Sequence, residues 1–295
     1  MTGGRPNRDV AFRRHHVSSN PLLNQKYFEP ETAAGAPGAP VPPAWDQTAS
    51  PWPPAEARVQ GRTMSIGGVA SATGVMFIFL LAAGWFGWGR VVETFAVNDA
   101  GQRVATTTFP TGWVLGSILV GFALVIACSF KPPLARFLAI PYSIAQGVAL
   151  GAISHVYDFQ SRGIALQAVL ATAGVFLAML VLYGLRILRA TPKLVKGVVA
   201  ATFGIMAMYA VGMIASLFGA DLRFWESTSL LSIGISLLIV GVAAFNLILD
   251  FDFIERGSKE GLPANMDWFA ALGLVVTLVW LYLEMLRLLS KLQRR

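Results

Sequence analysis

Residues 230–255, LLSIGISLLIVGVAAFNLILDFDFIE, decide both the fold class and the search for a functional site. The first part, residues 230–249, is an apolar run without charge, long enough to cross the ~30 Å hydrocarbon core of a bilayer as a helix. Asp250, Asp252 and Glu255 follow directly, where a membrane helix meets or enters the polar boundary. Desolvating a carboxylate there is costly, so these acids are candidates for a functional site. The alternative is that they only begin a cytoplasmic loop.

The composition of the whole chain is typical of a membrane protein. Its 295 residues are 55% hydrophobic and 13% charged, whereas soluble domains are about 45–50% apolar and ~25% charged. The formal net charge is +7, but the basic residues lie in the N-terminal tail and in short connections between apolar runs. This distribution indicates membrane topology and argues against a nucleic-acid partner.

The sequence contains no pattern that predicts an enzyme or a permanent cofactor. Its only cysteine, Cys128, lies within an apolar run, which excludes an internal disulfide framework and a multi-cysteine metal cluster. The chain has no HExxH, no Walker A loop and no G-x-S-x-G pattern. We therefore expect a protein that is not an enzyme.

The chain divides into a tail and a membrane domain. Residues 1–60 are rich in Pro, Ala and Gly and carry a basic front. Such a segment cannot bury enough apolar surface to offset the entropy lost on ordering, so we expect a disordered tail. Residues 61–295 are predicted to form the transmembrane domain.

Seven apolar runs in residues 61–295 are long enough to span a bilayer, which takes about 20 helical residues. The predicted fold is therefore an all-α membrane protein with seven transmembrane helices. The runs are residues 66–88, 113–130, 137–156, 164–185, 198–218, 230–249 and 268–289.

Small residues in two of the runs predict close approach of helix backbones. They are Gly67, Gly68, Ser71 and Gly74 in the first run, and Gly147 and Gly151 in the third.

Charge between the runs predicts the orientation. The flanks richest in positive charge are the tail, Lys131 with Arg136, and the group Arg186, Arg189, Lys193 and Lys196. The positive-inside rule then places the N-terminus in the cytoplasm, in a multi-pass protein of the cell membrane. Seven crossings place the C-terminus outside, although Arg287, Lys291, Arg294 and Arg295 crowd that end. The side of the C-terminus stays open.

Two short motifs resemble those of the transmembrane Bax-inhibitor-motif family, in its bacterial branch. Residues 247–252, LILDFD, look like the family's Tyr-Asp motif late in the sixth helix, with Leu249 in place of Tyr and Asp250 as the acid. Residues 280–289, WLYLEMLRLL, look like the SLYLDFINLF stretch of the seventh helix, with Glu284 in place of Asp. The third and fourth runs are similar too, and the resemblance covers about residues 66–290.

This resemblance implies six helices around a central seventh, C-terminal helix. Several members of the family conduct calcium as a pH-sensitive leak, and two acids from the last two helices are taken to share a proton and close the pore. Asp250 and Glu284 would be those gating acids. Some bacterial members are instead thought to be non-conducting regulators or partners of a membrane protease or another membrane complex. The implied partners are the lipid bilayer, calcium or another cation, or a membrane protein.

The residues by themselves also suit a hard cation. Asn246, Asp250, Asp252 and Glu255 supply oxygen ligands of the kind that calcium prefers, and Asp250 is the candidate for a transient calcium ligand. Asn246 and Asp250 are four residues apart and share a helical face. Protonation of Asp250 would remove a cation ligand or change the contact that closes the path.

The same helical face continues as a weakly polar stripe through Ser232, Ser236 and Ala243. Such a stripe could line an ion path. It could equally be a packing face, because hydroxyls often form hydrogen bonds across membrane helices.

Whether Asp250 and Glu284 meet depends on the register of the last two helices. With a turn near residues 257–265, the two acids differ in level by about 18 Å at 1.5 Å per residue. A register shifted by seven residues would bring Thr277 level with Asp250. Glu284 and Arg287 are three residues apart, so they can form an ion pair on their own helix or a latch to another helix.

Overall fold

The computed structural model describes residues 62–97, 103–108, 111–218 and 229–294, so the predicted tail of residues 1–60 lies outside the described part of the chain. Seven of its helices are long and apolar enough to cross a membrane, which confirms the predicted all-α membrane fold. These helices are α1 (Ile66–Trp88), α2 (Thr111–Phe130), α3 (Ala135–Gln160), α4 (Ile164–Gly184), α5 (Pro192–Leu217), α6 (Leu230–Lys259) and α7 (Met266–Gln293). A short 3-10 helix, η5 (Pro132–Leu134), precedes α3.

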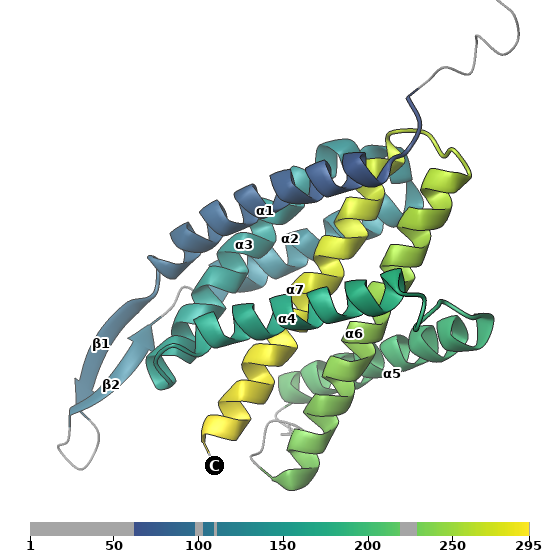
Figure 1. The fold of residues 1–295 in the computed structure, drawn as a ribbon. Helices are drawn as coiled ribbons and strands as arrows, with labels where there is room; N and C mark the ends of the chain where they lie inside the picture. Colours follow the sequence, from purple (N-terminus) through teal and green to yellow (C-terminus); the bar gives the residue numbers. More distant parts are fainter. Residues whose placement is uncertain (1–61, 98–102, 109–110, 219–228, 295) are drawn as a thin grey trace, which may run out of the picture. The chain divides into compact units, whose positions relative to one another are not determined.

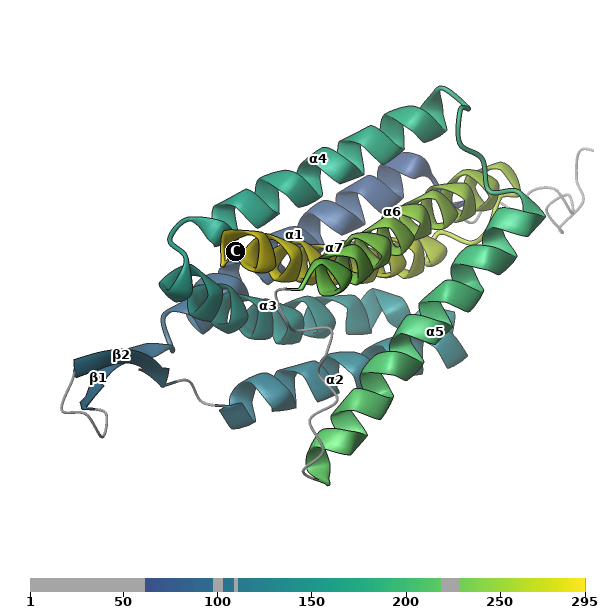
Figure 2. The same ribbon diagram turned by 90° about the horizontal axis from the view of Figure 1, so that it is seen from below.

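Helix α7 lies at the centre of the bundle, as the family resemblance implied. It packs against α1, α3, α4 and α6, while α2 lies against α3 and α5 lies against α6 (Figures 1 and 2). The buried residues of α7 extend from Asp267 to Lys291, as expected of a helix that neighbours surround.

Helix α6 extends ten residues beyond the predicted end of its apolar run, from residue 249 to Lys259. Its polar end carries two ion pairs between residues four apart, Asp252 with Arg256 and Glu255 with Lys259. Such pairs support a helix where apolar burial ends. The acids therefore lie within the helix, and the alternative that they only begin a loop is wrong.

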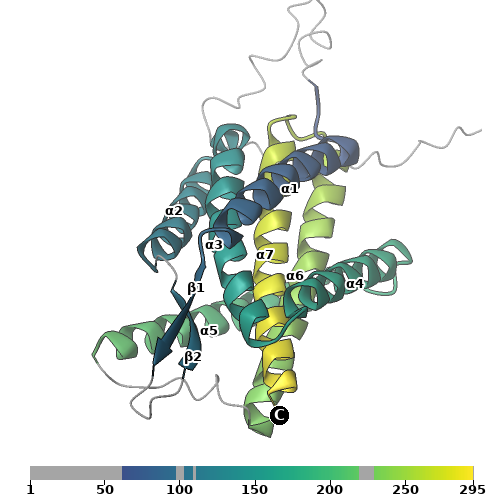
Figure 3. The same ribbon diagram turned by 90° about the vertical axis from the view of Figure 1, so that its left-hand side faces the viewer.

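A two-stranded hairpin that the sequence analysis did not predict connects α1 to α2. Strands β1 (Val92–Val97) and β2 (Arg103–Thr108) are antiparallel, with Val92 opposite Thr108 (Figure 3). Their sequences, VETFAV and RVATTT, are rich in the β-branched residues that favour strands. The strands are short and lie outside the apolar runs, so the pattern of hydrophobicity does not indicate them.

Glycines bring α1 and α3 into close contact. A Cβ atom on Gly151 would overlap the backbone of Gly84, and one on Gly87 would overlap the backbone of Val148. The close packing predicted from Gly147 and Gly151 is thus confirmed. The prediction is wrong for Gly67 and Gly74, where a Cβ would meet no atom within 4 Å.

The start of α1 is tied to the turn between α6 and α7. The Met64 amide donates to the Leu262 carbonyl at 2.7 Å, and the Ser65 amide donates to Asp267 Oδ1 at 3.0 Å. Asp267 is buried and lies beside the first turn of α1, where a carboxylate stabilises the free amides. These contacts fix where α7 begins and hence its register against α6.

Candidate functional site

Asp250 faces α7 at the level of Gly273 and Thr277. Its Oδ1 atom would lie 3.6 Å from a Cβ atom on Gly273, and its carboxylate lies beside the Thr277 hydroxyl. The Thr277 hydroxyl donates to the Gly273 carbonyl at 3.2 Å. Asp250 Oδ2 is buried and has no hydrogen-bond partner among the described residues. A buried polar atom without a partner is rare and calls for an explanation.

The other two acids of α6 are held in surface ion pairs. Asp252 Oδ2 lies 2.8 Å from Arg256 Nε. Glu255 pairs with Lys259 and accepts a hydrogen bond from the Tyr183 hydroxyl of α4. These contacts stabilise the end of α6 and do not involve Asp250.

Asn246 lies one turn before Asp250 but contacts a different helix. Its Nδ2 donates to Thr202 Oγ1 of α5 at 2.9 Å and to the Val242 carbonyl at 3.0 Å. The oxygen donors predicted to bind calcium together are therefore divided between neighbours. Within the residues that the structure describes, no three His, Cys, Asp or Glu side chains are grouped so that they could hold a metal ion.

Glu284 lies in a paired cluster on α7. It is only 1% exposed, and Arg287 Nη1 donates to its two carboxylate oxygens at 3.0 and 3.1 Å. The Tyr209 hydroxyl of α5 donates to Glu284 Oε1 at 2.8 Å, and the Arg287 guanidinium lies 5.0 Å from the centre of the Tyr209 ring. The predicted Glu284–Arg287 ion pair is thus present, and Tyr209 connects it to a second helix.

Lys291 is a buried cation that the sequence analysis did not place in the site. It is 4% exposed, and its Nζ donates to Ser232 Oγ at 2.8 Å and to Ser236 Oγ at 2.7 Å. The two serines of the predicted polar stripe therefore contact α7. The spacing of Glu284, Arg287 and Lys291, at i, i+3 and i+7, could have identified this shared face.

The structure does not bring Asp250 and Glu284 together. Asp250 is level with Thr277, and Glu284 follows seven residues later, about 10 Å along the helix axis. This is the shifted register that the sequence analysis considered. The two acids lie at different levels of one contact between α6 and α7, each with its own neighbours.

Seven membrane-length helices with α7 at their centre, and carboxylates along the contact between α6 and α7, define a multi-pass membrane protein. The model of the family described as Bax inhibitor 1 like matches residues 20–294, and the chain therefore belongs to this family. The match begins at residue 20, within the tail that the motif resemblance left out. In the other two comparisons, no curated protein and no solved structure matched the chain.

Proposed function

We propose that this protein is a pH-sensitive cation leak of the cell membrane, with calcium as the ion and Asp250 as the acid that the ion meets. The observation that carries the proposal is the buried Oδ2 atom of Asp250, which lies within a membrane-length helix and has no hydrogen-bond partner among the described residues. Polar groups at such a depth are costly and often mark ion paths.

The position of Asp250 fits a route from the side of the α6–α7 turn. Asp250 lies nine residues, about 14 Å, before the end of α6 at Lys259. The basic connections between α2 and α3 and between α4 and α5 lie at this same end of the helices, because successive spanning helices alternate in direction. In the proposal, the positive-inside rule makes it the cytoplasmic side, where the N-terminus also lies.

A single carboxylate suits passage better than storage of an ion. Calcium prefers six to eight oxygen ligands, so one carboxylate with water binds it weakly. Conduction requires binding that is strong enough for entry and weak enough for release. Only the ionised form of Asp250 is a ligand, so the proposal has calcium flux rise with pH.

Glu284 has a different task in this proposal. Its contacts with Arg287 and Tyr209 join α7 to α5 at the other end of the contact between α6 and α7. We place the closing latch there, so the leak opens when this cluster separates. Proton sharing between Asp250 and Glu284 is not part of the proposal, because the two carboxylates lie at different levels.

The test is calcium flux into liposomes that contain the purified full-length protein, measured from about pH 5 to 8, the range in which buried carboxylates can titrate. We expect Asp250→Asn to abolish most of the flux and its pH dependence. Asp252→Asn is the matched control: it removes the same charge two residues away, from a surface ion pair, and should leave the flux nearly unchanged. Tyr209→Phe weakens the latch and should raise the flux.

Flux that is absent at every pH in correctly inserted protein would overturn the proposal. The alternative, a non-conducting regulator or partner of a membrane protease or another membrane complex, would then be the better interpretation. Equal effects of Asp250→Asn and Asp252→Asn would reject the assignment of Asp250 as the acid.

A further inference from the structure

The side chain of His155 joins three elements at the end of the bundle opposite the α6–α7 turn. His155 lies in the last part of α3, and the centre of its ring lies 4.8 Å from the centre of the Trp88 ring at the end of α1. Its Nε2 atom lies 3.2 Å from Glu93 Oε1 of β1. The hairpin of β1 and β2 therefore contacts the ends of two helices through this side chain.

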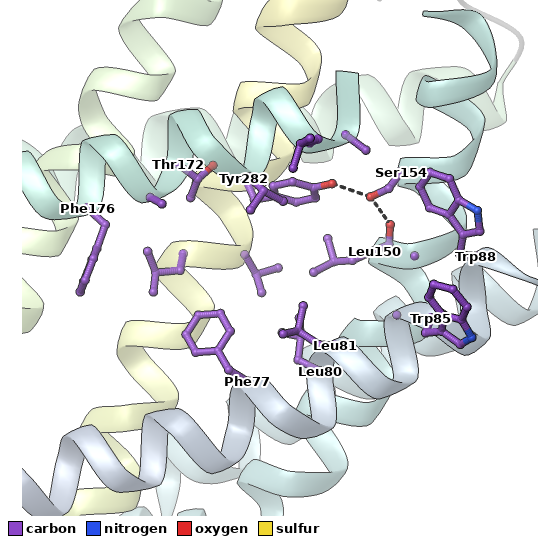
Figure 4. A pocket seen from close by; sticks show the side chains of 18 of the residues that line it. Phe77, Leu80, Leu81, Trp85, Trp88, Leu150, Ser154, Thr172, Phe176 and Tyr282 are labelled. Atoms are coloured by element: carbon purple, nitrogen blue, oxygen red, sulfur yellow. Dashed lines mark hydrogen bonds between the residues drawn. The ribbon is translucent and has the colours of Figure 1, made fainter. Parts of the chain in front are cut away.

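Neighbouring contacts hold the end of α3 in place. Ser154, directly before His155, has its hydroxyl 2.6 Å from the Tyr282 hydroxyl of α7. Figure 4 shows this hydrogen bond together with Trp88 of α1. On the other side, Val91 is buried in one cluster with Ala149 and Ala152 of α3. The His155 ring is therefore fixed beside Trp88, and Glu93 follows the buried Val91 by two residues.

The two hydrogen bonds of the His155 ring need a proton on each nitrogen. Nδ1 lies 2.9 Å from the Trp88 carbonyl oxygen, and a carbonyl oxygen can only accept. Nε2 contacts the Glu93 carboxylate, which in its ionised form can also only accept. A neutral imidazole has a single N–H group. The two contacts together therefore need one proton more than a neutral histidine beside an ionised glutamate carries.

Both neighbours of the ring attract a positive charge. Trp88 is the last residue of α1, and the carbonyl groups of a last helical turn have no partner within the helix and bind cations. Glu93 supplies a full negative charge. A carboxyl group ordinarily loses its proton at lower pH than an imidazolium, so the additional proton belongs to His155. The His155 side chain is only 14% exposed, and these two acceptors are its polar partners.

Other titratable side chains near this end of the bundle have contacts of their own. With the partner of each, they are Asp158 with the Gly163 amide, Arg90 with the Phe86 ring, Tyr282 with Ser154, and Arg294 with Gln160. Among the residues that the structure describes, Glu93 is the side chain that pairs with His155.

We propose that His155 is a proton-binding site that fastens the β1–β2 hairpin to the ends of α1 and α3. With the proton bound, Nδ1 donates to the Trp88 carbonyl and Nε2 donates to Glu93. When the proton leaves, one nitrogen faces an acceptor without a hydrogen between them. The Trp88 contact is kept, because that carbonyl belongs to a packed helix end, whereas the half-exposed Glu93 turns to water and releases the hairpin.

This site is separate from Asp250 and does not depend on ion conduction. Imidazole groups change their charge within about pH 5–8, so the hairpin is held at the acidic end of this range and released at the other. In the orientation proposed above, the hairpin lies outside the cell, and the site responds to external pH.

The first experiment measures hydrogen–deuterium exchange of residues 92–97 in the full-length protein in lipid nanodiscs, with wild type and Glu93→Gln compared at the same pH. A two-stranded hairpin by itself is marginally stable in water, so its amides exchange faster once it is released. At about pH 5.5 we expect exchange to be roughly two- to fivefold faster in Glu93→Gln, the size of an exposed ion pair. At about pH 8 the two proteins should exchange equally, because the imidazole is then neutral.

Two further variants test the assignment of the partners. Asp158→Asn is the matched control: it removes a negative charge one turn after His155, from a contact with the Gly163 amide, and should leave the exchange of residues 92–97 unchanged. His155→Phe keeps a ring beside Trp88 and should give the result of Glu93→Gln, with no further change in the double variant. Equal effects of Asp158→Asn and Glu93→Gln would overturn the proposal, and so would an effect of Glu93→Gln that is the same at both pH values.

The second experiment detects the protons on the ring directly. The chain has three histidines, so replacing His15 and His16 with Gln leaves His155 as the single imidazole for NMR of isotope-labelled histidine in nanodiscs. Couplings between ring nitrogens and carbon-bound hydrogens distinguish the imidazolium from the two neutral tautomers. We expect the imidazolium at low pH and the Nδ1–H tautomer at high pH, because the Trp88 carbonyl holds that hydrogen. A neutral Nε2–H tautomer would keep the Glu93 contact and would overturn the release of the hairpin.

Discussion

The two ends of the contact between α6 and α7 differ in how their charged side chains are partnered. At the aspartate end, formed by Asp250, Gly273 and Thr277, one carboxylate oxygen is buried without a partner among the described residues. At the lysine end, formed by Glu284, Arg287, Lys291, Ser232 and Ser236, the charges are held by ion pairs and hydrogen bonds. Both ends lie on the same pair of helices, and they differ in the partners that surround each charge.

The difference separates two uses of an acid in a membrane helix. A buried charge with good partners holds helices together, and removing one partner is strongly destabilising. A buried acid with one oxygen that has no partner among the described residues contributes less to the fold, and that oxygen remains available for an ion or a proton. The comparison therefore predicts that stability depends mainly on the lysine end, which also holds the latch closed, and that passage of the ion depends on the aspartate end.

The largest effect is expected for Glu284→Gln, which leaves Arg287 with a neutral partner in a buried cluster. Breaking one side of a buried pair costs about 3–5 kcal/mol. The measurement is the free energy of unfolding in mixed micelles, followed by circular dichroism. The double variant Glu284→Gln with Arg287→Gln should recover part of the loss. A loss below 1 kcal/mol in the single variant would contradict a structural role for the lysine end.

Ser236→Ala should give the next largest effect. It removes an acceptor at 2.7 Å from the buried ammonium of Lys291, and a hydrogen bond to a charged group contributes about 1.5–3 kcal/mol. The same unfolding assay measures the loss. Ser129→Ala is the control: the Ser129 hydroxyl is exposed and donates to the Val125 carbonyl of its own helix, so its removal should cost less than about 0.5 kcal/mol. Equal losses in both variants would show that the hydrogen bond from Lys291 to Ser236 contributes no more to the free energy of unfolding than an exposed serine hydroxyl.

Asp250→Asn tests the aspartate end of the contact between α6 and α7. Because Oδ2 has no partner to lose, we expect the free energy of unfolding to change by less than about 1 kcal/mol, while most of the calcium flux disappears. Unfolding and flux are measured on the same preparation. A loss of more than 3 kcal/mol would mean that the aspartate end is structural too.

The smallest effect is expected for Arg256→Gln. Arg256 is 61% exposed in its pair with Asp252, and such surface pairs contribute about 0.3–0.5 kcal/mol. We expect a change of that size in unfolding, reduced further by added salt. A larger loss of unfolding free energy that does not depend on salt would mean that another part of the protein or a partner covers the end of α6.

The membrane fold could be predicted almost entirely from the sequence. The run at residues 66–88 coincides with α1, because an uninterrupted apolar segment has no other stable conformation in a bilayer. The end of α6 could not be placed, because charges four residues apart continue a helix that hydropathy alone would end. The hairpin was missed because its strands are short and moderately polar.

The candidate site was only partly predictable. The sequence supplied Asp250, Glu284 and Arg287 as candidates from their cost in a membrane and their spacing. It could not decide the register of α7, because that depends on contacts far apart in the chain, such as Ser65 with Asp267. A shift of seven residues keeps every apolar face buried, so the pattern of hydrophobicity cannot distinguish the two registers.

The sequence by itself determined that this protein spans a membrane with seven helices and which acids lie among them, because both follow from composition along the chain. Only the tertiary structure decided that Asp250 faces Thr277 of α7 while Glu284 faces Tyr209 of α5. The physical reason is that the cost of burying a charge is set by its residue type, whereas its partners are set by helices that meet across the bundle.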